Sequence, residues 1–501
     1  MVAEVMANLF HYQTFLALLI GVVGGLIIGV LPGLNATMAI ALLLPFTFGM
    51  MPAAGMIMLT AVFASAVYGG GVLAILVCTP GTPGNAATAI DGYALTKQGR
   101  GLEAIGVLTI ASTIGGVVSA LFLLFAAPPL ALVSLRFNAP EYFLIAIFGL
   151  TIIGSLAGKN MLKGLIVGAI GMAIAFIGFD TVFGTPRFTY QNIHLESGIQ
   201  LVPALVGLFS MSQVLIMSEN VEAIRRGDKI ELPNVSGKFL PTIKDFIIAL
   251  PNLMRSIGVG ILVGILPGPG GDIGSWLAYN ESRRWSKNKD LFGKGSMEAI
   301  WATESANNAT ASGSLVPTMA LGIPGSAAAA VLLGGFMLNG LIPGHQLFTV
   351  QGGITYAILL GFLFSKLLMG VIGIFICRRL AKLANAPLGI LVPVIVVLSV
   401  VGAYAINLSF FDAGVMIVFG FIGYFLRKTG FPTAPVVLAL ILTPMAEQGF
   451  HRAIIMSTDT PILIYYLSRP ICVVLIFLII LSLCSPFILK KMEKRVAGKS
   501  S

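Results

Sequence analysis

A run of polar side chains, ESANNATASGS, occupies residues 304–314 and leads directly into an apolar stretch. It carries one acid, Glu304, two amides, Asn307 and Asn308, and the hydroxyl of Thr310. Acidic and amide side chains inside a membrane segment are costly and mark functional sites. We predict that the amides and Thr310 bind substrate and that Glu304 couples an ion. The alternative places Glu304 at the membrane interface, just beyond a cytoplasmic loop.

Two Pro-Gly turns interrupt apolar sequence, GVLPGLNAT at 29–37 and GILPGPGGD at 264–272. A helix breaker at membrane depth frees backbone groups that lipid cannot satisfy, so it survives only in a protein interior or beside a polar cavity. The exposed carbonyls of such turns suit a hard cation such as Na⁺. The ion-coupling candidates here are Pro32, Gly33, Gly268, Gly270, Gly271 and Asp272. Asp272 fits a helix cap equally well.

Asn35 and Thr37 follow the first turn directly, where a new helix is expected to start. The free N–H groups of a helix start attract anions, and an Asn or Thr oxygen can cap the helix or bind a cation. We predict that both residues bind substrate. In the alternative interpretation they are helix caps only.

A second break follows in each half, Gly-Thr-Pro-Gly at 81–84 and Gly-Ile-Pro-Gly at 322–325. Each precedes a new helix whose N-terminal amides point back at the break, an arrangement that favours anions. The substrate-binding candidates at these breaks are Thr82, Gly84, Asn85, Gly325 and Ser326. The alternative is a kinked helix that serves packing alone.

The composition indicates a polytopic all-α membrane protein. Of the 501 residues, 57% are hydrophobic and 10% are charged, whereas soluble domains carry about 25% charge. About nine ordinary spans of about 20 residues are expected besides the interrupted segments. The net charge of +10 is assigned to short cytoplasmic loops and not to nucleic-acid binding. The N-terminus lacks the basic region of a cleavable signal peptide.

Enzyme signatures are missing from the sequence: it has no phosphate-binding P-loop, no zinc spacing and no nucleophile elbow. We therefore expect no enzyme activity, no catalytic residue, no cofactor, and no metal beyond Na⁺ as a coupling ion.

Charge bias in the loops predicts the topology. The loop after the second break is basic in the first half, with Lys97 and Arg100, but carries no Lys or Arg at 340–346 in the second half. By the positive-inside rule, equivalent loops then lie on opposite sides of the membrane, as in an inverted-topology repeat. The same rule puts the C-terminus in the cytoplasm and the N-terminus in the periplasm.

The expected organisation is a first membrane repeat at 1–217, a cytoplasmic linker at 218–245, and a second repeat with an extra C-terminal span at 246–501. Each repeat would hold a re-entrant helical hairpin, a discontinuous helix and about four to five further transmembrane helices. The discontinuous helices fall at 53–96 and 299–342. Each is alternatively a single span with a short re-entrant arm.

The sequence resembles the large membrane subunit of the tripartite tricarboxylate transporters, the TctA family. The resemblance covers nearly the whole chain, and its specific segments include GVLPGLNATMAIALLLPFTFGM, YGGGVLAILVCTPGTPGNAATAIDGYALTKQGRG, GILPGPGGDIGSWLAYNE and ATESANNATASGSLVPTMALGIPGSAAAA.

This resemblance implies a multi-pass permease of the bacterial inner membrane. It would work with a small, TctB-like membrane subunit and a periplasmic, TctC-like solute-binding protein. The lipid bilayer surrounds it, and no nucleic acid takes part. The implied reaction is symport of a di- or tricarboxylate such as citrate with Na⁺ or H⁺. The alternative is an ion channel, which would give uncoupled flux, or a structural membrane scaffold, which has no reason to carry two costly helix breaks.

Overall fold

The computed structural model describes residues 1–156, 161–180, 182–219, 239–266, 270–383, 388–457 and 460–481. The chain forms two compact units, the first made of 1–132 and 205–424 and the second of 133–204 and 425–501. Each unit takes segments from both halves of the sequence, and each is described by itself.

The first unit is built from helices only. In chain order they are α1 (Val2–Leu9), α2 (Tyr12–Val30), α3 (Ala36–Leu43), α4 (Pro52–Val77), α5 (Ala86–Lys97), α6 (Gly101–Val133), α11 (Ser212–Ser218), α13 (Ile243–Ile265), α14 (Gly270–Trp285), α15 (Met297–Leu321), α16 (Ala327–Leu338), α17 (His345–Phe348), α18 (Gly352–Leu383), α19 (Leu388–Asn407) and α20 (Phe410–Lys428).

The described part of the chain contains 8 helices that are long and apolar enough to cross a membrane. Shorter apolar helices accompany them, among them Ala36–Thr47 and Ala327–Leu338, which flank the predicted breaks. The prediction of an all-α polytopic membrane protein is confirmed. The opposed insertion of two repeats stays a prediction.

Proline and glycine end the helices where the sequence predicts. α2 ends at Val30 before Pro32, and Gly33 takes a φ of +84°, which favours glycine because it has no Cβ. α3 then begins behind Asn35, whose side chain accepts the Met38 N–H. The tip of the second hairpin, including Gly268, lies outside the described residues.

Both long interrupted segments break at the second Pro-Gly motif. α4 ends at Val77, with Cys78 left-handed, and the chain turns helical again at the one-turn η2 (Pro83–Asn85) and α5. α15 ends at Leu321 with Gly322 left-handed, and α16 begins behind Ser326. The N–H groups of these left-handed residues bond backbone carbonyls in the last turn, and the left-handed conformation stops the helix.

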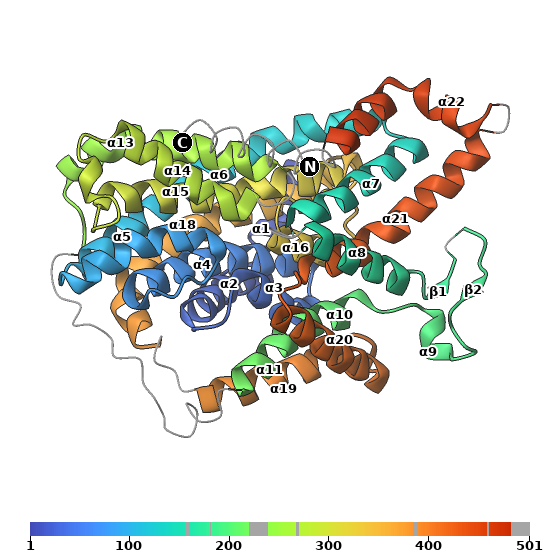
Figure 1. Ribbon diagram of the computed structural model, residues 1–501, viewed down its shortest axis with the longest axis horizontal. Coiled ribbons are helices and arrows are strands. Elements are labelled where there is room, and N and C mark those ends of the chain that lie inside the picture. Colours follow the sequence, from blue (N-terminus) through green and yellow to red (C-terminus); the bar gives the residue numbers. More distant parts are fainter. Residues whose placement is uncertain are drawn as a thin grey trace, which may run out of the picture. The chain divides into compact units, whose positions relative to one another are not determined.

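Glycines bring the hairpin arms close to the long helices in both halves. A Cβ on Gly25 of α2 would lie 2.6 Å from the Val62 carbonyl oxygen of α4, and one on Gly260 of α13 would lie 2.4 Å from that of Ala306 of α15. Only glycine permits this backbone approach. α13, α14 and α15 lie side by side (Figure 1).

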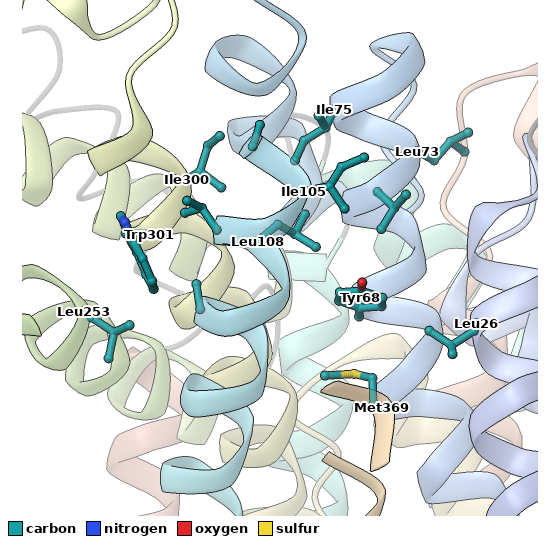
Figure 2. Close-up of a cluster of buried hydrophobic side chains, with 14 of the residues drawn as sticks. Leu26, Tyr68, Leu73, Ile75, Ile105, Leu108, Leu253, Ile300, Trp301 and Met369 are labelled. Atoms are coloured by element: carbon teal, nitrogen blue, oxygen red, sulfur yellow. The ribbon is translucent and has the colours of Figure 1, made fainter. Parts of the chain in front are cut away.

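A large apolar cluster ties α4, α6, α13, α15 and α18 together. Figure 2 shows Tyr68 next to Met369, with Leu108 on a neighbouring helix, and Trp301 near Leu253. These side chains come from both halves of the sequence, so the core of this unit joins the two predicted repeats. Burial of apolar area supplies its cohesion.

The second unit packs α7 (Ala139–Leu156), α8 (Met161–Ala175) and α21 (Ala434–Met456) against one another (Figure 1). A short antiparallel pair, β1 (Gly178–Phe179) and β2 (Pro186–Arg187), follows α8. Its other helices include α9 (Ile193–Glu196), α10 (Leu201–Val206), whose end passes into the first unit, α22 (Ile462–Leu467) and the apolar helix Pro470–Leu481.

Candidate functional site

The polar segment predicted to carry function forms the middle of α15, and this helix is buried along nearly all of its length. Glu304 and Asn308 are 0% exposed. Residues three and four positions apart share a helix face. Thr303, Asn307, Thr310 and Ser314 therefore form one polar face, and Glu304, Asn308 and Ser312 form another.

Glu304 is held by residues of the first half. Its Oε1 accepts from the Thr88 hydroxyl at 2.6 Å and from the Asn85 amide at 3.1 Å, and its Oε2 accepts from Ser112 at 3.1 Å. Gly71 makes room for the carboxylate, since a Cβ there would lie 2.9 Å from both oxygens. The acid of one half thus binds the helix start behind the break of the other.

Asn85 is fixed from both ends of its amide. Its Oδ1 accepts from the Thr82 hydroxyl at 2.6 Å, and its Nδ2 also donates to the Val67 carbonyl at 3.3 Å. These partners determine which end of the amide faces Glu304. Gly84 is buried beside Asn85. The structure therefore brings three of the predicted site residues, Thr82, Asn85 and Glu304, into one network.

The other polar face of α15 runs between the two breaks. At one end the Thr303 hydroxyl lies 2.8 Å from the Thr88 hydroxyl oxygen, and at the other Ser314 lies 3.4 Å from the Ser326 hydroxyl. Asn307 lies between them, 4% exposed, and its Nδ2 has no hydrogen-bond partner in the described part of the chain. A buried amide donor without a partner is costly, so this group is ready for a ligand that accepts hydrogen bonds.

Thr310 lies on the same face but is already bonded. Its hydroxyl donates to the Ala306 carbonyl at 2.7 Å, and a Cβ on Gly274 of α14 would lie 2.5 Å from it. The second hairpin arm therefore covers this part of α15. Gly270, Gly271 and Asp272 form the first turn of α14, but the Asp272 side chain lies outside the description.

Each hairpin arm ends against the break of its own half. A Cβ on Gly81 would lie 3.2 Å from the Gly29 carbonyl oxygen, and one on Gly325 would lie 2.8 Å from that of Gly264. In each half, a glycine of the second break therefore lies against the end of the helix that precedes the first turn. Ser326 also caps α16 by accepting the Ala329 N–H.

The first Pro-Gly turn is not joined to this network by any hydrogen bond among the described residues. Asn35 acts as the N-cap of α3, Thr37 and Pro32 are half-buried, and Gly33 is exposed. The structure thus shows the capping role that the sequence left open for Asn35. Substrate binding by Asn35 and Thr37 stays a prediction, as does ion coupling at Pro32 and Gly33.

The sequence analysis missed Asp91 and Lys366, two charged residues that are 0% exposed. Asp91 of α5 is fully buried and accepts the N–H groups of Gly293, Gly295 and Ser296 through Oδ1. It thereby anchors the start of α15, where a negative charge also meets the favourable end of the helix dipole. The sequence signal for Asp91 was an acidic residue between the second break of the first half, at 81–84, and the basic loop at Lys97.

The second missed charge is Lys366 of α18, which is 0% exposed. Its Nζ donates to Asn308 Oδ1 at 3.2 Å and lies 5.0 Å from the centre of the Phe362 ring. A Cβ on Gly116 of α6 would lie 2.6 Å from its Cδ, so that glycine makes room for the lysine stem. A single lysine within the apolar stretch 352–376 was the available signal.

A separate charged cluster occupies the second unit. Asp180, Glu447 and His451 place ligand atoms within 4.8 Å of one another. The guanidinium of Arg187 pairs with Asp180 at 3.5 Å and with Glu447. Backbone N–H groups of Phe183 and Val182, together with Arg187, hold the pKa of Asp180 below its usual value. Arg187 therefore supplies the counter-charge of these acids, and the arrangement is an ion-pair cluster.

Comparison with known proteins supports the family assignment. The family model described as "Tripartite tricarboxylate transporter TctA family" matches residues 15–438. An uncharacterized 52.8 kDa protein in the TAR-I ttuC' 3' region of Agrobacterium vitis is 35% identical over 87% of this chain and 86% of its own length. An uncharacterized protein in the TAR-II ttuC' 3' region of the same organism is 35% identical over 40% of this chain and 82% of its own length.

No solved structure matches this chain. The family match spans both Pro-Gly turns, both second breaks and the whole of α15. The chain is therefore a member of the TctA family, the large subunits of tripartite tricarboxylate transporters.

Proposed function

We propose that this chain is the permease subunit of a secondary active carboxylate uptake system of the bacterial inner membrane. It takes up a di- or tricarboxylate in symport with Na⁺ or H⁺. A periplasmic binding protein delivers the substrate, and a small membrane subunit completes the assembly. Family membership and the multi-pass helical fold support this proposal.

The observation that carries the substrate assignment is the unpartnered amide of Asn307. It lies on α15 between the helix start at Asn85 and the helix start at Ser326. A carboxylate there gains hydrogen bonds from the amide and a favourable position relative to free backbone N–H groups. Asn308 and Thr310 flank this position, and Gly325 keeps the second break close to α15.

Ion coupling is assigned to the network around Glu304. Among the described residues, its carboxylate accepts hydrogen bonds from neutral donors only, so a bound cation or proton would offset its charge. The domain organisation at 1–217, 218–245 and 246–501 remains part of the proposal, and residues 220–238 of the linker lie outside the description. Opposed insertion of the two repeats would let the site open to each side in turn.

Uptake in proteoliposomes tests the substrate assignment. The full chain with its partner subunits should accumulate radiolabelled citrate or succinate under an ion gradient. Asn307→Ala should lower the initial rate at least about tenfold, because a hydrogen bond to a charged ligand contributes about 1.5–3 kcal/mol.

Asn339→Ala is the matched control. This amide belongs to the same unit and already donates to the Gly335 carbonyl at 2.9 Å, so its removal should leave uptake unchanged. Equal uptake by Asn307→Ala and the wild type would disprove the substrate assignment. A channel would instead give flux that never exceeds equilibrium, and a scaffold would give none.

A further inference from the structure

Lys366 is a charge that the proposed substrate site does not use. Its stem fills the space left by Gly116, and its amine donates to Asn308 Oδ1, a neutral acceptor. An ammonium has three N–H donors, and a buried one is costly without an anion. The position is therefore shaped for a lysine but does not supply a direct counter-charge.

The nearest acid on the facing helix is Glu304, one helical turn before Asn308. Four residues of helix correspond to about 6 Å along the axis. Both groups are fully buried, and each hydrogen-bonds to neutral partners, with no ion pair joining them among the described residues. On α6, Ser112 faces Glu304, and Gly116, one helical turn later, faces Lys366.

Asp91 of α5, one turn beyond Thr88, is engaged by the N–H groups of Gly293, Gly295 and Ser296. α2 and α4 carry no charged residue, although the Tyr68 hydroxyl of α4 faces Gly373 of α18, two turns beyond Lys366. On α6 the acid is Glu103, which pairs with Arg100. Glu298 lies at the start of α15, Glu4 of α1 faces Gly353, and His345 belongs to α17. Among the residues whose side chains the structure describes, no other charged group bonds to Glu304 or Lys366.

We propose that Glu304 and Lys366 together bind the coupling proton, which makes the coupling ion H⁺. In the empty carrier the pair holds one proton, as carboxylate with ammonium or as carboxylic acid with amine, and is neutral in both arrangements. A proton taken from the outer solution converts it to carboxylic acid with ammonium. The added positive charge offsets one negative charge of the substrate and is released with it inside.

The polar network connects this pair to the proposed substrate position. Thr88 bonds both Glu304 and Thr303, and Thr303 lies one turn before Asn307 on the same face of α15. Asn308, next in sequence to Asn307, bonds Lys366. Substrate and proton would thus be bound from two faces of one helix. The inference rests on the proposed function and names its coupling ion.

The experiment uses the full chain with its partner subunits in liposomes and radiolabelled citrate or succinate as the probe. A pH gradient, acidic outside, should drive accumulation without Na⁺. In weakly buffered detergent solution, substrate addition should cause proton uptake, measured with a pH dye. Lys366→Met and Glu304→Gln should each lower accumulation and substrate-linked proton uptake at least about tenfold. The double variant should show accumulation and proton uptake no lower than those of the less active single variant.

Lys163→Met is the matched control, because this lysine lies in an apolar helix of the second unit and donates to the Thr429 carbonyl. It should behave as the wild type. Elution profile and unfolding temperature identify variants that fail to fold, and the wild-type measurements do not depend on any variant.

Three results would overturn the inference. One is accumulation driven by a Na⁺ gradient alone, and another is the absence of substrate-linked proton uptake in the wild type. Either result would keep the transport function but exclude H⁺ as the coupling ion. Full coupling in Lys366→Met would make the lysine a packing residue. Absence of citrate or succinate accumulation under either gradient would contradict the proposed function itself.

Discussion

Buried acids are stabilised differently in the two units. In the second unit Asp180 and Glu447 share the guanidinium of Arg187. In the first unit the Glu304 carboxylate is held by two hydroxyls and an amide, and no cation contacts it among the described residues. A paired acid has its charge offset within the fold, whereas an acid held by neutral donors is free to take a cation during transport.

Removing the Thr88 hydroxyl should have the largest effect, because it bonds both Glu304 and Thr303. Thr88→Val keeps the side-chain shape but deletes a hydrogen bond to a charged group, worth about 1.5–3 kcal/mol. We expect gradient-driven uptake to fall at least about tenfold and the unfolding temperature to drop.

Thr60→Val is the control for this change. Thr60 is equally buried, but its hydroxyl donates to carbonyls of its own helix, so little should change. If both variants transported alike, the hydroxyl network around Glu304 would be structural only, and the contrast between the units would fail.

Breaking the paired cluster should affect stability and leave coupling intact. Arg187→Gln removes the cation between Asp180 and Glu447. Because Arg187 is 26% exposed, the free energy of unfolding should fall by about 1–2 kcal/mol. The unfolding temperature should fall, while the number of protons taken up per substrate stays the same. A changed proton number would show that this cluster takes part in transport.

The smallest expected effect is a pH dependence of stability from Asp180. Its pKa is lower in the folded protein than its usual value of 3.8, chiefly through the N–H groups of Phe183 and Val182. A lowered pKa stabilises the fold above the unfolded value, and the stabilisation is lost as the pH falls through the folded value. The wild type should therefore lose stability on acidification below about pH 4.

Asp180→Asn supplies the comparison for this prediction. The amide oxygen can keep the two N–H bonds but does not titrate in this range. Melting curves between neutral and acidic pH should converge for the two proteins as the pH falls. Parallel curves at all pH values would exclude Asp180 as the source of the acid sensitivity.

Much of the fold was predictable because helix breakers act locally. Pro-Gly and Gly-x-Pro-Gly stop helices whatever surrounds them, so the breaks at Leu31 and Cys78 appear where expected. The candidate site was predictable in part. Polar residues in apolar sequence identified Asn85, Glu304 and Asn307, but the same rule was not applied to Lys366 within α18.

The sequence by itself determined the membrane class, the helix breaks and the family, because composition, local backbone chemistry and sequence motifs are properties of the chain alone. Only the tertiary structure decided that Glu304 binds Asn85, Thr88 and Ser112, that Lys366 reaches Asn308, and that Asn307 lacks a partner. These contacts join residues far apart in sequence. They depend on glycines that let helices approach closely, and local spacing does not reveal which helices meet.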